Sequence, residues 1–126
     1  MPSTDYAPAA RFRTALRRFL RESETVARAH GLTPRQYLLL LQIAAAEDGT
    51  ATVSELVDLL ALTQSTVTEL VQRAEAAGLV ARTISAQDAR VAHLSLTSTG
   101  EARLSRVHAQ LGTERIRLRS VIEGTE

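Results

Sequence analysis

Four threonines divide this chain into helices, and their positions constrain the fold more than any other feature. They are Thr33, Thr52, Thr63 and Thr97. A threonine hydroxyl just before a helix accepts a hydrogen bond from a backbone N–H of the first turn, which would otherwise lack a partner. Gln36 and Glu55, each three residues after such a threonine, complete capping boxes. The sequence therefore predicts four helix starts at these positions.

A further helix precedes the first of these threonines. Apolar residues in 9–30 recur at steps of three and four, which gives a helix one apolar face, and arginines occupy the opposite side. His30-Gly31 ends it, because glycine readily adopts the left-handed conformation that follows a helix. The helices that begin after Thr52 and Thr63 are short and are joined through Ala61-Leu62, which is the arrangement of a helix-turn-helix.

The hydrophobic period changes after Gly78. Residues 79–84 and 90–96 are short runs of β type, and the polar residues 85–89 between them predict a hairpin turn. A last long helix over 98–123 has apolar residues at near-heptad spacing. We therefore predict a mainly α fold with a small β-hairpin wing, in which a winged helix-turn-helix is flanked by long N- and C-terminal helices.

The composition excludes several classes of protein. The 126 residues fit a single domain, 1–126, and the absence of cysteine excludes disulfides, Cys-ligated zinc and thiol redox sensing within this chain. No nucleophile elbow, glycine-rich phosphate loop or metal-ligand spacing of histidines occurs, so we expect neither an enzyme nor a cofactor or metal. No apolar run is long enough to span a membrane, and residues 1–11 lack a signal pattern, so we expect a cytoplasmic protein.

Charge is unevenly distributed along the chain. All 15 basic residues are arginine and the net charge is +1. Residues 9–30 hold six arginines against two glutamates, a net charge of +4, whereas residues 50–100 hold three arginines against five carboxylates, a net charge of −2. The helix-turn-helix and its wing are therefore slightly acidic, and non-specific affinity for nucleic acid should be modest.

Short motifs between Leu32 and Gly100 together resemble the multiple-antibiotic-resistance regulator (MarR) family of bacterial transcription factors. They are Leu32-Thr33 with Gln36, Leu62-Thr63, Thr66-Val67-Thr68, Gly78-Leu79-Val80, Arg82, Asp88-x-Arg90, and Leu96-Thr97 with Gly100. The resemblance implies a dimeric regulator whose affinity for double-stranded DNA falls when a small, often phenolic, ligand binds. It also implies that the first and last helices form the dimer interface.

A winged helix places its second short helix in the major groove, with the hairpin at the backbone or minor groove. Residues 33–97 are then the DNA-binding core. The predicted DNA contacts are Gln64, Ser65, Thr66, Thr68, Gln72, Arg73, Arg82, Asp88 and Arg90. In the family pattern, an arginine enters the minor groove beside an aspartate that orients it, and Asp88 and Arg90 have that spacing. The alternatives are a solvated polar face on the helix and a surface ion pair on the wing.

Glu69 departs from the family pattern, which often has a basic residue there. A carboxylate facing DNA repels phosphate unless it accepts a hydrogen bond from a cytosine amino group. Alternatively, Glu69 forms an ion pair with Arg73 one helical turn later.

Helices 9–30 and 98–123 are predicted to dimerise. The predicted interface residues are Phe12, Leu16, Phe19, Leu104, Val107, Leu111 and Leu118. Packing of these two helices within one chain is the alternative. Phe19, His30 and Tyr37 are candidates for lining a pocket for a small aromatic ligand, although a packed core would also explain them.

The sequence thus predicts a MarR-type regulator that binds a pseudo-palindromic operator as a homodimer and is released by a small non-covalent ligand. The rival hypothesis is a winged-helix protein-interaction module without sequence-specific DNA binding. The acidic charge of residues 50–100 and Glu69 favour the rival, whereas Asp88-x-Arg90 favours DNA.

Overall fold

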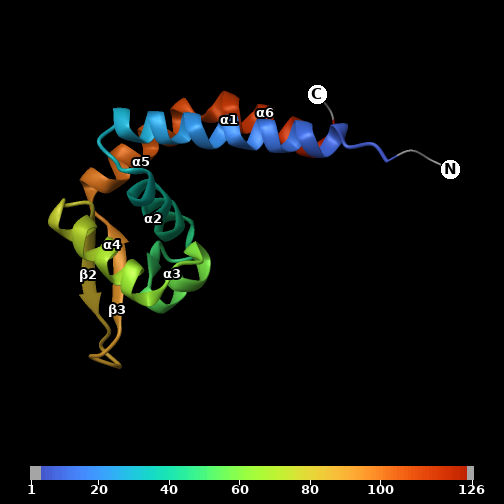
Figure 1. The fold of residues 1–126 in the computed structure, drawn as a ribbon. Coiled ribbons are helices and arrows are strands. Elements are labelled where there is room, and N and C mark those ends of the chain that lie inside the picture. The colour runs from blue at the N-terminus through green and yellow to red at the C-terminus, as the bar shows by residue number, and fades with distance from the viewer. Residues whose placement is uncertain (1–3, 125–126) are drawn as a thin grey trace.

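The computed structural model describes residues 4–124 and consists of a winged-helix head and two helical arms (Figure 1). The helices are α1 (Ala7–Ala29), α2 (Pro34–Ala45), α3 (Val53–Leu60), α4 (Gln64–Ala76), α5 (Ser98–Gln110) and α6 (Gly112–Glu123). The strands are β1 (Thr50–Ala51), β2 (Val80–Ile84) and β3 (Ala92–Leu96). The head comprises α2 to β3, the arms are α1 and α6, and α5 joins the two parts. Among the described residues, no helix has the length and apolar character needed to cross a membrane.

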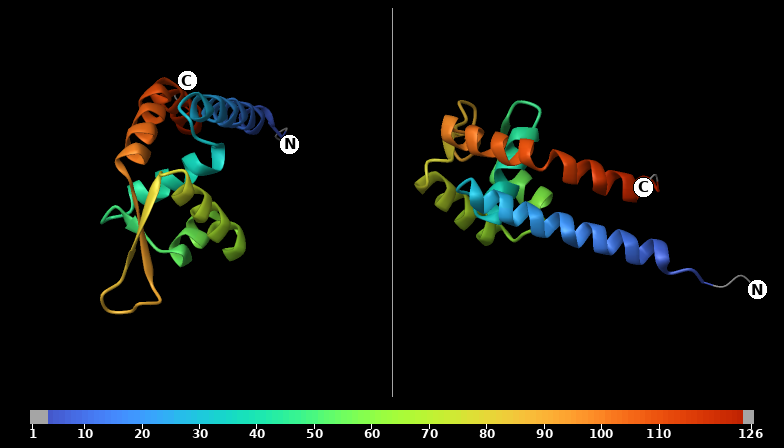
Figure 2. Two further views of the ribbon diagram at one scale, coloured as in Figure 1. Left: turned by 90° about the vertical axis from the view of Figure 1, so that its left-hand side faces the viewer. Right: turned by 90° about the horizontal axis from the view of Figure 1, so that it is seen from above.

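The arms α1 and α6 lie side by side and run in opposite directions (Figures 1 and 2). They project well beyond the head, so that the start of α1 and the end of α6 lie far from α4 and the wing. The molecule is therefore elongated at one end, and much of the arm surface has no cover from the head.

All four threonine caps predicted from the sequence form. Thr33 and Thr52 make complete capping boxes with the residues three positions later. Thr63 accepts a hydrogen bond from the Thr66 amide at 3.3 Å, and Thr97 accepts one from the Gly100 amide at 3.1 Å. The starts of α2, α3, α4 and α5 are therefore determined by local sequence.

The turn between α3 and α4 depends on one alanine in an unusual conformation. Ala61 has φ 54° and ψ 42°, and it is the one non-glycine residue with positive φ within residues 4–124. Its amide donates to the Val57 carbonyl and so ends α3. The chain reverses over Ala61 and Leu62, and α4 can begin directly after Thr63.

The sheet contains a short strand that the sequence did not predict. Its strand order is β1-β3-β2, with both pairs antiparallel. In the wing, Val80 pairs with Leu96 and Ile84 pairs with Ala92, which agrees with the predicted hairpin. The unpredicted β1 pairs with the base of β3, where Ala51 lies opposite Leu94. It thereby attaches the wing to the segment between α2 and α3.

The predicted last helix is divided into two, and its first half belongs to the core. The break lies at Leu111, directly before Gly112. Leu104, Val107 and Leu111 were predicted to lie in a dimer interface, but they are buried among the core residues of their own chain. That prediction is wrong for these three residues, because side chains already covered within one chain leave no surface for a partner.

A compact junction ties the end of α4, the wing and α5 together. The Thr97 amide donates to the Leu79 carbonyl at 3.0 Å, and the Thr97 hydroxyl donates to the Gly78 carbonyl at 2.6 Å. Gly100, in the first turn of α5, lies so close that a Cβ atom there would be 2.2 Å from the Leu79 carbonyl oxygen. We call Gly78, Leu79, Thr97 and Gly100 the Thr97 junction.

This close approach gives a test of the junction. Gly100→Ala should lower the free energy of unfolding by about 1–3 kcal/mol or more, because the new methyl group meets a backbone atom rather than a movable side chain. Gly112→Ala is the matched control. Its Cβ would have no neighbour closer than 3.8 Å, so it should stabilise the chain by about 0.5–1 kcal/mol. Urea denaturation of both variants checks this, and equal effects of the two substitutions would contradict the packing described.

Candidate nucleic-acid interface

The outer face of α4 is polar and accessible. Val67, Leu70, Val71 and Ala74 are buried in the core, as the helical spacing predicted. The opposite side carries six of the predicted contacts. Gln64, Ser65, Gln72 and Arg73 are exposed, and Thr66 and Thr68 are half-buried. This face offers hydroxyl, amide and guanidinium groups to a ligand outside the helix.

Hydroxyl groups at the start of α4 form a small network around its cap. The Thr63 hydroxyl donates to the Thr66 hydroxyl at 2.8 Å and lies 3.3 Å from the Ser65 hydroxyl. This arrangement fixes the side chains of the first turn before any ligand arrives. A helix N-terminus with ordered hydroxyls and free amides is a favourable site for a phosphate.

Glu69 and Arg73 form an ion pair on the exposed face of α4. Arg73 Nη2 lies 2.6 Å from Glu69 Oε1, and the two side chains remain 73% and 60% exposed. The sequence left open whether Glu69 pairs with Arg73 or reads a base, and the structure shows the pair. At this exposure the pair contributes only about 0.3–0.5 kcal/mol to stability.

Arg82 on β2 is tied to the far end of α4. Its Nη2 donates to Glu75 Oε1 at 2.8 Å and its Nε to Glu75 Oε2 at 3.5 Å. These hydrogen bonds raise the pKa of Arg82 above its ordinary value. The contact was not predicted, because Glu75 and Arg82 lie in different elements. It holds the wing against α4, and it leaves Arg82 less available to DNA than the sequence suggested.

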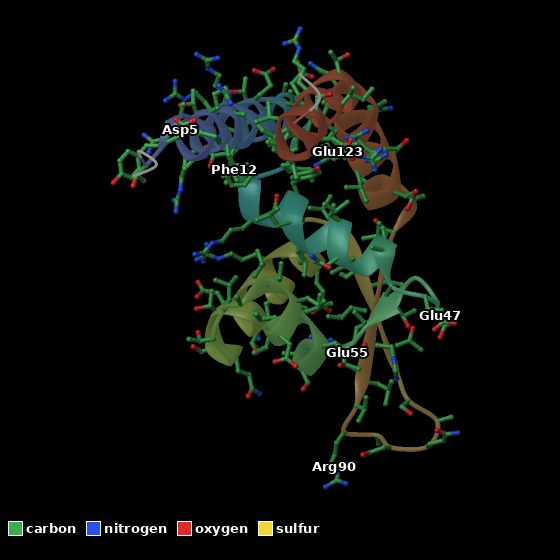
Figure 3. The ribbon with its side chains drawn as sticks, turned by 90° about the vertical axis from the view of Figure 1, so that its right-hand side faces the viewer. Asp5, Phe12, Glu47, Glu55, Arg90 and Glu123 are labelled. Atoms are coloured by element: carbon green, nitrogen blue, oxygen red, sulfur yellow. The ribbon has the colours of Figure 1, made fainter. Side chains whose placement is uncertain are left out.

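Asp88 organises the tip of the wing. Its Oδ1 accepts hydrogen bonds from the Arg90 amide at 2.9 Å and from Arg90 Nε at 3.2 Å, while its own amide donates to the Ser85 hydroxyl. The Arg90 side chain is 91% exposed and points away from the rest of the molecule (Figure 3). The structure therefore brings Asp88 and Arg90 together as the sequence predicted, with the guanidinium at the outermost point of the wing.

Each arginine in residues 50–100 thus has a carboxylate partner in the same chain. Arg73 pairs with Glu69, Arg82 with Glu75, and Arg90 with Asp88. The two remaining acidic residues of this segment are Glu55, in its capping box, and Asp58. Residues 50–100 consequently offer few unpaired cations to a phosphate backbone, in keeping with the net charge of −2 of this segment.

Comparison with known proteins gives the family. A sequence model of the MarR family matches residues 30–91, from the end of α1 to the loop of the wing. The HTH-type transcriptional repressor MdtR of Bacillus subtilis (strain 168) is 35% identical over 79 residues, which are 63% of this chain and 50% of MdtR. This chain belongs to the MarR family.

Solved structures agree on the fold of this MarR-family chain. The YusO protein from Bacillus subtilis is 28% identical, with a TM-score of 0.68 over 83% of this chain and 73% of that one. A cysteine-to-serine mutant of MarR from E. coli, complexed with operator DNA, is 22% identical, with a TM-score of 0.72 over 92% of this chain and 85% of that one. The winged helix-turn-helix is therefore the fold of this chain, which spans about half the length of the curated relative it matches.

The three residues proposed to line a ligand pocket in this MarR-family chain lie in three different settings. Tyr37 belongs to the core, where burial raises the pKa of its phenol. His30 lies at the end of α1, and its Nε2 is 2.7 Å from Gln110 Oε1, within hydrogen-bond distance. Phe19 is half-buried and lines a groove of about 690 Å³ between α1 and α6. The structure does not gather the three into one pocket.

The hydrogen bonds of Asp88 give a titration test of the wing tip. They lower the pKa of the Asp88 carboxyl, and the bond from the Arg90 amide has the larger effect, followed by the bond from the Arg90 side chain. Arg90→Ala removes only the second, so the Asp88 pKa should rise yet stay below the ordinary value of about 3.9. NMR titration of the carboxyl carbon measures this, and an unchanged pKa would show that the Arg90 side chain does not hold Asp88 in solution.

Proposed function

We propose that this protein is a DNA-binding transcriptional regulator of MarR type. In this proposal a homodimer binds a pseudo-palindromic operator, with α4 in the major groove and the wing at the backbone or minor groove. The observation that carries the proposal is the combination of the exposed polar face of α4 with the exposed Arg90 at the wing tip. The similar MarR structure complexed with operator DNA, and the repressor name of the relative MdtR, support it.

Arg90 is the residue in the wing best placed to contact DNA. Its side chain is almost fully exposed at the wing tip, and the hydrogen bond to Asp88 limits the directions in which the guanidinium can point. A narrow minor groove concentrates negative potential and attracts a guanidinium group. The paired arginines of the head reduce its general attraction for phosphate, so specific contacts must supply a large share of the affinity.

Fluorescence anisotropy tests the function. It measures binding to DNA from upstream of the gene for this protein and to a random duplex, at several salt concentrations. We expect a preference for the upstream DNA and an affinity that falls with salt. Arg90→Ala should weaken binding and lower the salt slope by about one unit, because one phosphate-associated cation is lost. Arg119→Ala is the matched control, since it removes an exposed, ion-paired arginine from α6 rather than from the head.

The other outcomes separate the hypotheses. A wild-type protein with neither sequence preference nor salt dependence would favour the winged-helix protein-interaction module instead. If the wild-type protein prefers one sequence and Arg90→Ala binds it equally tightly, the proposed regulatory function stands. The proposed contact between Arg90 and DNA is then wrong.

The arms supply the proposed dimer interface. Phe12, Leu20, Ile116 and Ile122 are large apolar residues on α1 and α6 that stay exposed, and Leu16, Phe19 and Leu118 are half-buried. An apolar surface spread along two projecting helices is typical of a protein-binding site. The remaining predicted interface residues Phe12, Leu16, Phe19 and Leu118 all lie on these arms.

Sedimentation tests the dimer. We expect a dimeric mass at micromolar concentration, and Phe12→Glu should shift the protein toward monomer, because the substitution places a charge on the apolar arm surface. A monomeric mass for the wild-type protein would contradict the dimer. Thermal unfolding of the variant is the control, since exposed Phe12 contributes little to the core of one chain (Figure 3).

The groove between α1 and α6 is the proposed place for a small non-covalent ligand. It combines the apolar side chains of Phe19, Leu118 and Val121 with charged groups such as Arg18 and Glu114. An apolar site with a few charged groups fits a small aromatic molecule.

A further inference from the structure

Glu69 occupies the middle of the exposed face of α4. The buried residues of this helix are Val67, Leu70, Val71 and Ala74, and Glu69 lies on the side away from them. Under the proposed function, on which this inference rests, that face enters the major groove. A carboxylate there lies closer to the base edges than any other acidic side chain of α4, because Glu75 belongs to the last turn and is bound to Arg82.

The carboxylate of Glu69 keeps the capacity to accept another hydrogen bond. Arg73 donates to Oε1, and within residues 4–124 no hydrogen bond is made to Oε2. An ionised carboxylate can accept about four hydrogen bonds in all. Glu75 provides the contrast, since the Arg82 guanidinium occupies both of its oxygens. Pairing with Arg73 therefore holds the Glu69 side chain in place and leaves Oε2 able to accept a further hydrogen bond.

Arg73 also reduces the electrostatic cost of bringing Glu69 to DNA. An unpaired carboxylate would be repelled by both phosphate strands, whereas the Glu69–Arg73 pair has no net charge. The 2.6 Å separation keeps the compensating charge beside the carboxylate during the approach. The side chain that faces the bases is then an acceptor whose charge is balanced locally.

The base edges of the major groove differ in how they meet an acceptor. Cytosine presents its N4 amino group as a donor, whereas guanine presents only acceptors and thymine an acceptor with a methyl group. Adenine places an acceptor next to its amino group, so a carboxylate that meets it also meets the N7 lone pair. We propose that Glu69 reads a cytosine at one position in each half-site of the operator by accepting a hydrogen bond from N4.

Selection from a pool of random duplexes tests this proposal. The wild-type protein should enrich a motif with cytosine at one symmetric position in each half-site. Glu69→Gln should keep the rest of the motif and change that position to adenine, because a glutamine amide pairs with the N6 and N7 groups of adenine. Glu47→Gln, which removes the same charge from the exposed loop after α2, should enrich the wild-type motif (Figure 3).

A second measurement uses only the wild-type protein. Replacing the selected cytosine by N4-methylcytosine keeps the base pair but substitutes a methyl group for the N–H that faces the major groove. Affinity should fall about tenfold, within the range of one direct base contact. The same modification at a cytosine outside the half-site position should leave affinity unchanged.

The remaining outcomes overturn one proposal or both. If Glu69→Gln binds all sequences more tightly and enriches the unchanged motif, Glu69 serves only to restrain Arg73 and the base-reading proposal fails. An unaffected affinity for the methylated operator would overturn it as well. If the wild-type protein enriches no motif, the proposed regulatory function fails first, and the assignment of Glu69 fails with it.

Discussion

The contact of the first turn of α5 with the Leu79 carbonyl is the constraint on which the rest of the structure depends. The Thr97 hydroxyl caps α5 and donates to the Gly78 carbonyl, and the Thr97 amide donates to the Leu79 carbonyl, so one residue joins the end of α4, the segment leading into β2 and the start of α5. Gly100 permits this approach because it has no Cβ. The Thr97 junction therefore connects the wing, α4 and α5, and the β1–β3 pairing and the Arg82–Glu75 contact hold the wing in addition.

The three arginines of residues 50–100 are held in a defined arrangement by carboxylates of the same chain. The nitrogen–oxygen distances are 2.6, 2.8 and 3.2 Å for Arg73, Arg82 and Arg90, so each guanidinium has a preferred direction. The Asp88–Arg90 pair leaves the guanidinium 91% exposed at the wing tip, whereas the Glu69–Arg73 pair balances the charge of a carboxylate on the outer face of α4. The Arg82–Glu75 pair is less exposed and acts as a brace between wing and helix. For the proposed binding of DNA, side chains that are already oriented lose less conformational freedom when they make contacts.

Local signals predicted most of this fold from the sequence, and the misses have physical reasons. The threonine caps lie within three residues of the groups they bind, so spacing indicated them. The Glu69–Arg73 pair was one of two alternatives from helical spacing, and the Asp88–Arg90 contact was expected from the resemblance to the family pattern. The strand β1 has only two residues and shows no periodicity. The Arg82–Glu75 contact joins two elements, so no local pattern indicates it. The near-heptad spacing of Leu104, Val107 and Leu111 shows that one face is buried, but the same spacing serves a partner helix and the chain's own core equally well.

The position of α5 links the proposed ligand groove to the proposed DNA surface. Its first turn lies in the Thr97 junction, Arg103 donates to the Gly31 carbonyl at 3.0 Å, and Gln110 bonds to His30 at the end of α1. The helix is thus attached to the wing at one end and to the corner between α1 and α2 along its length (Figure 2). In a dimer, the arms set the separation of two recognition helices, which must match half-sites about 34 Å apart. A ligand that changed the angle between α1 and α6 would move the attachments of α5 and, through the Thr97 junction, the wing.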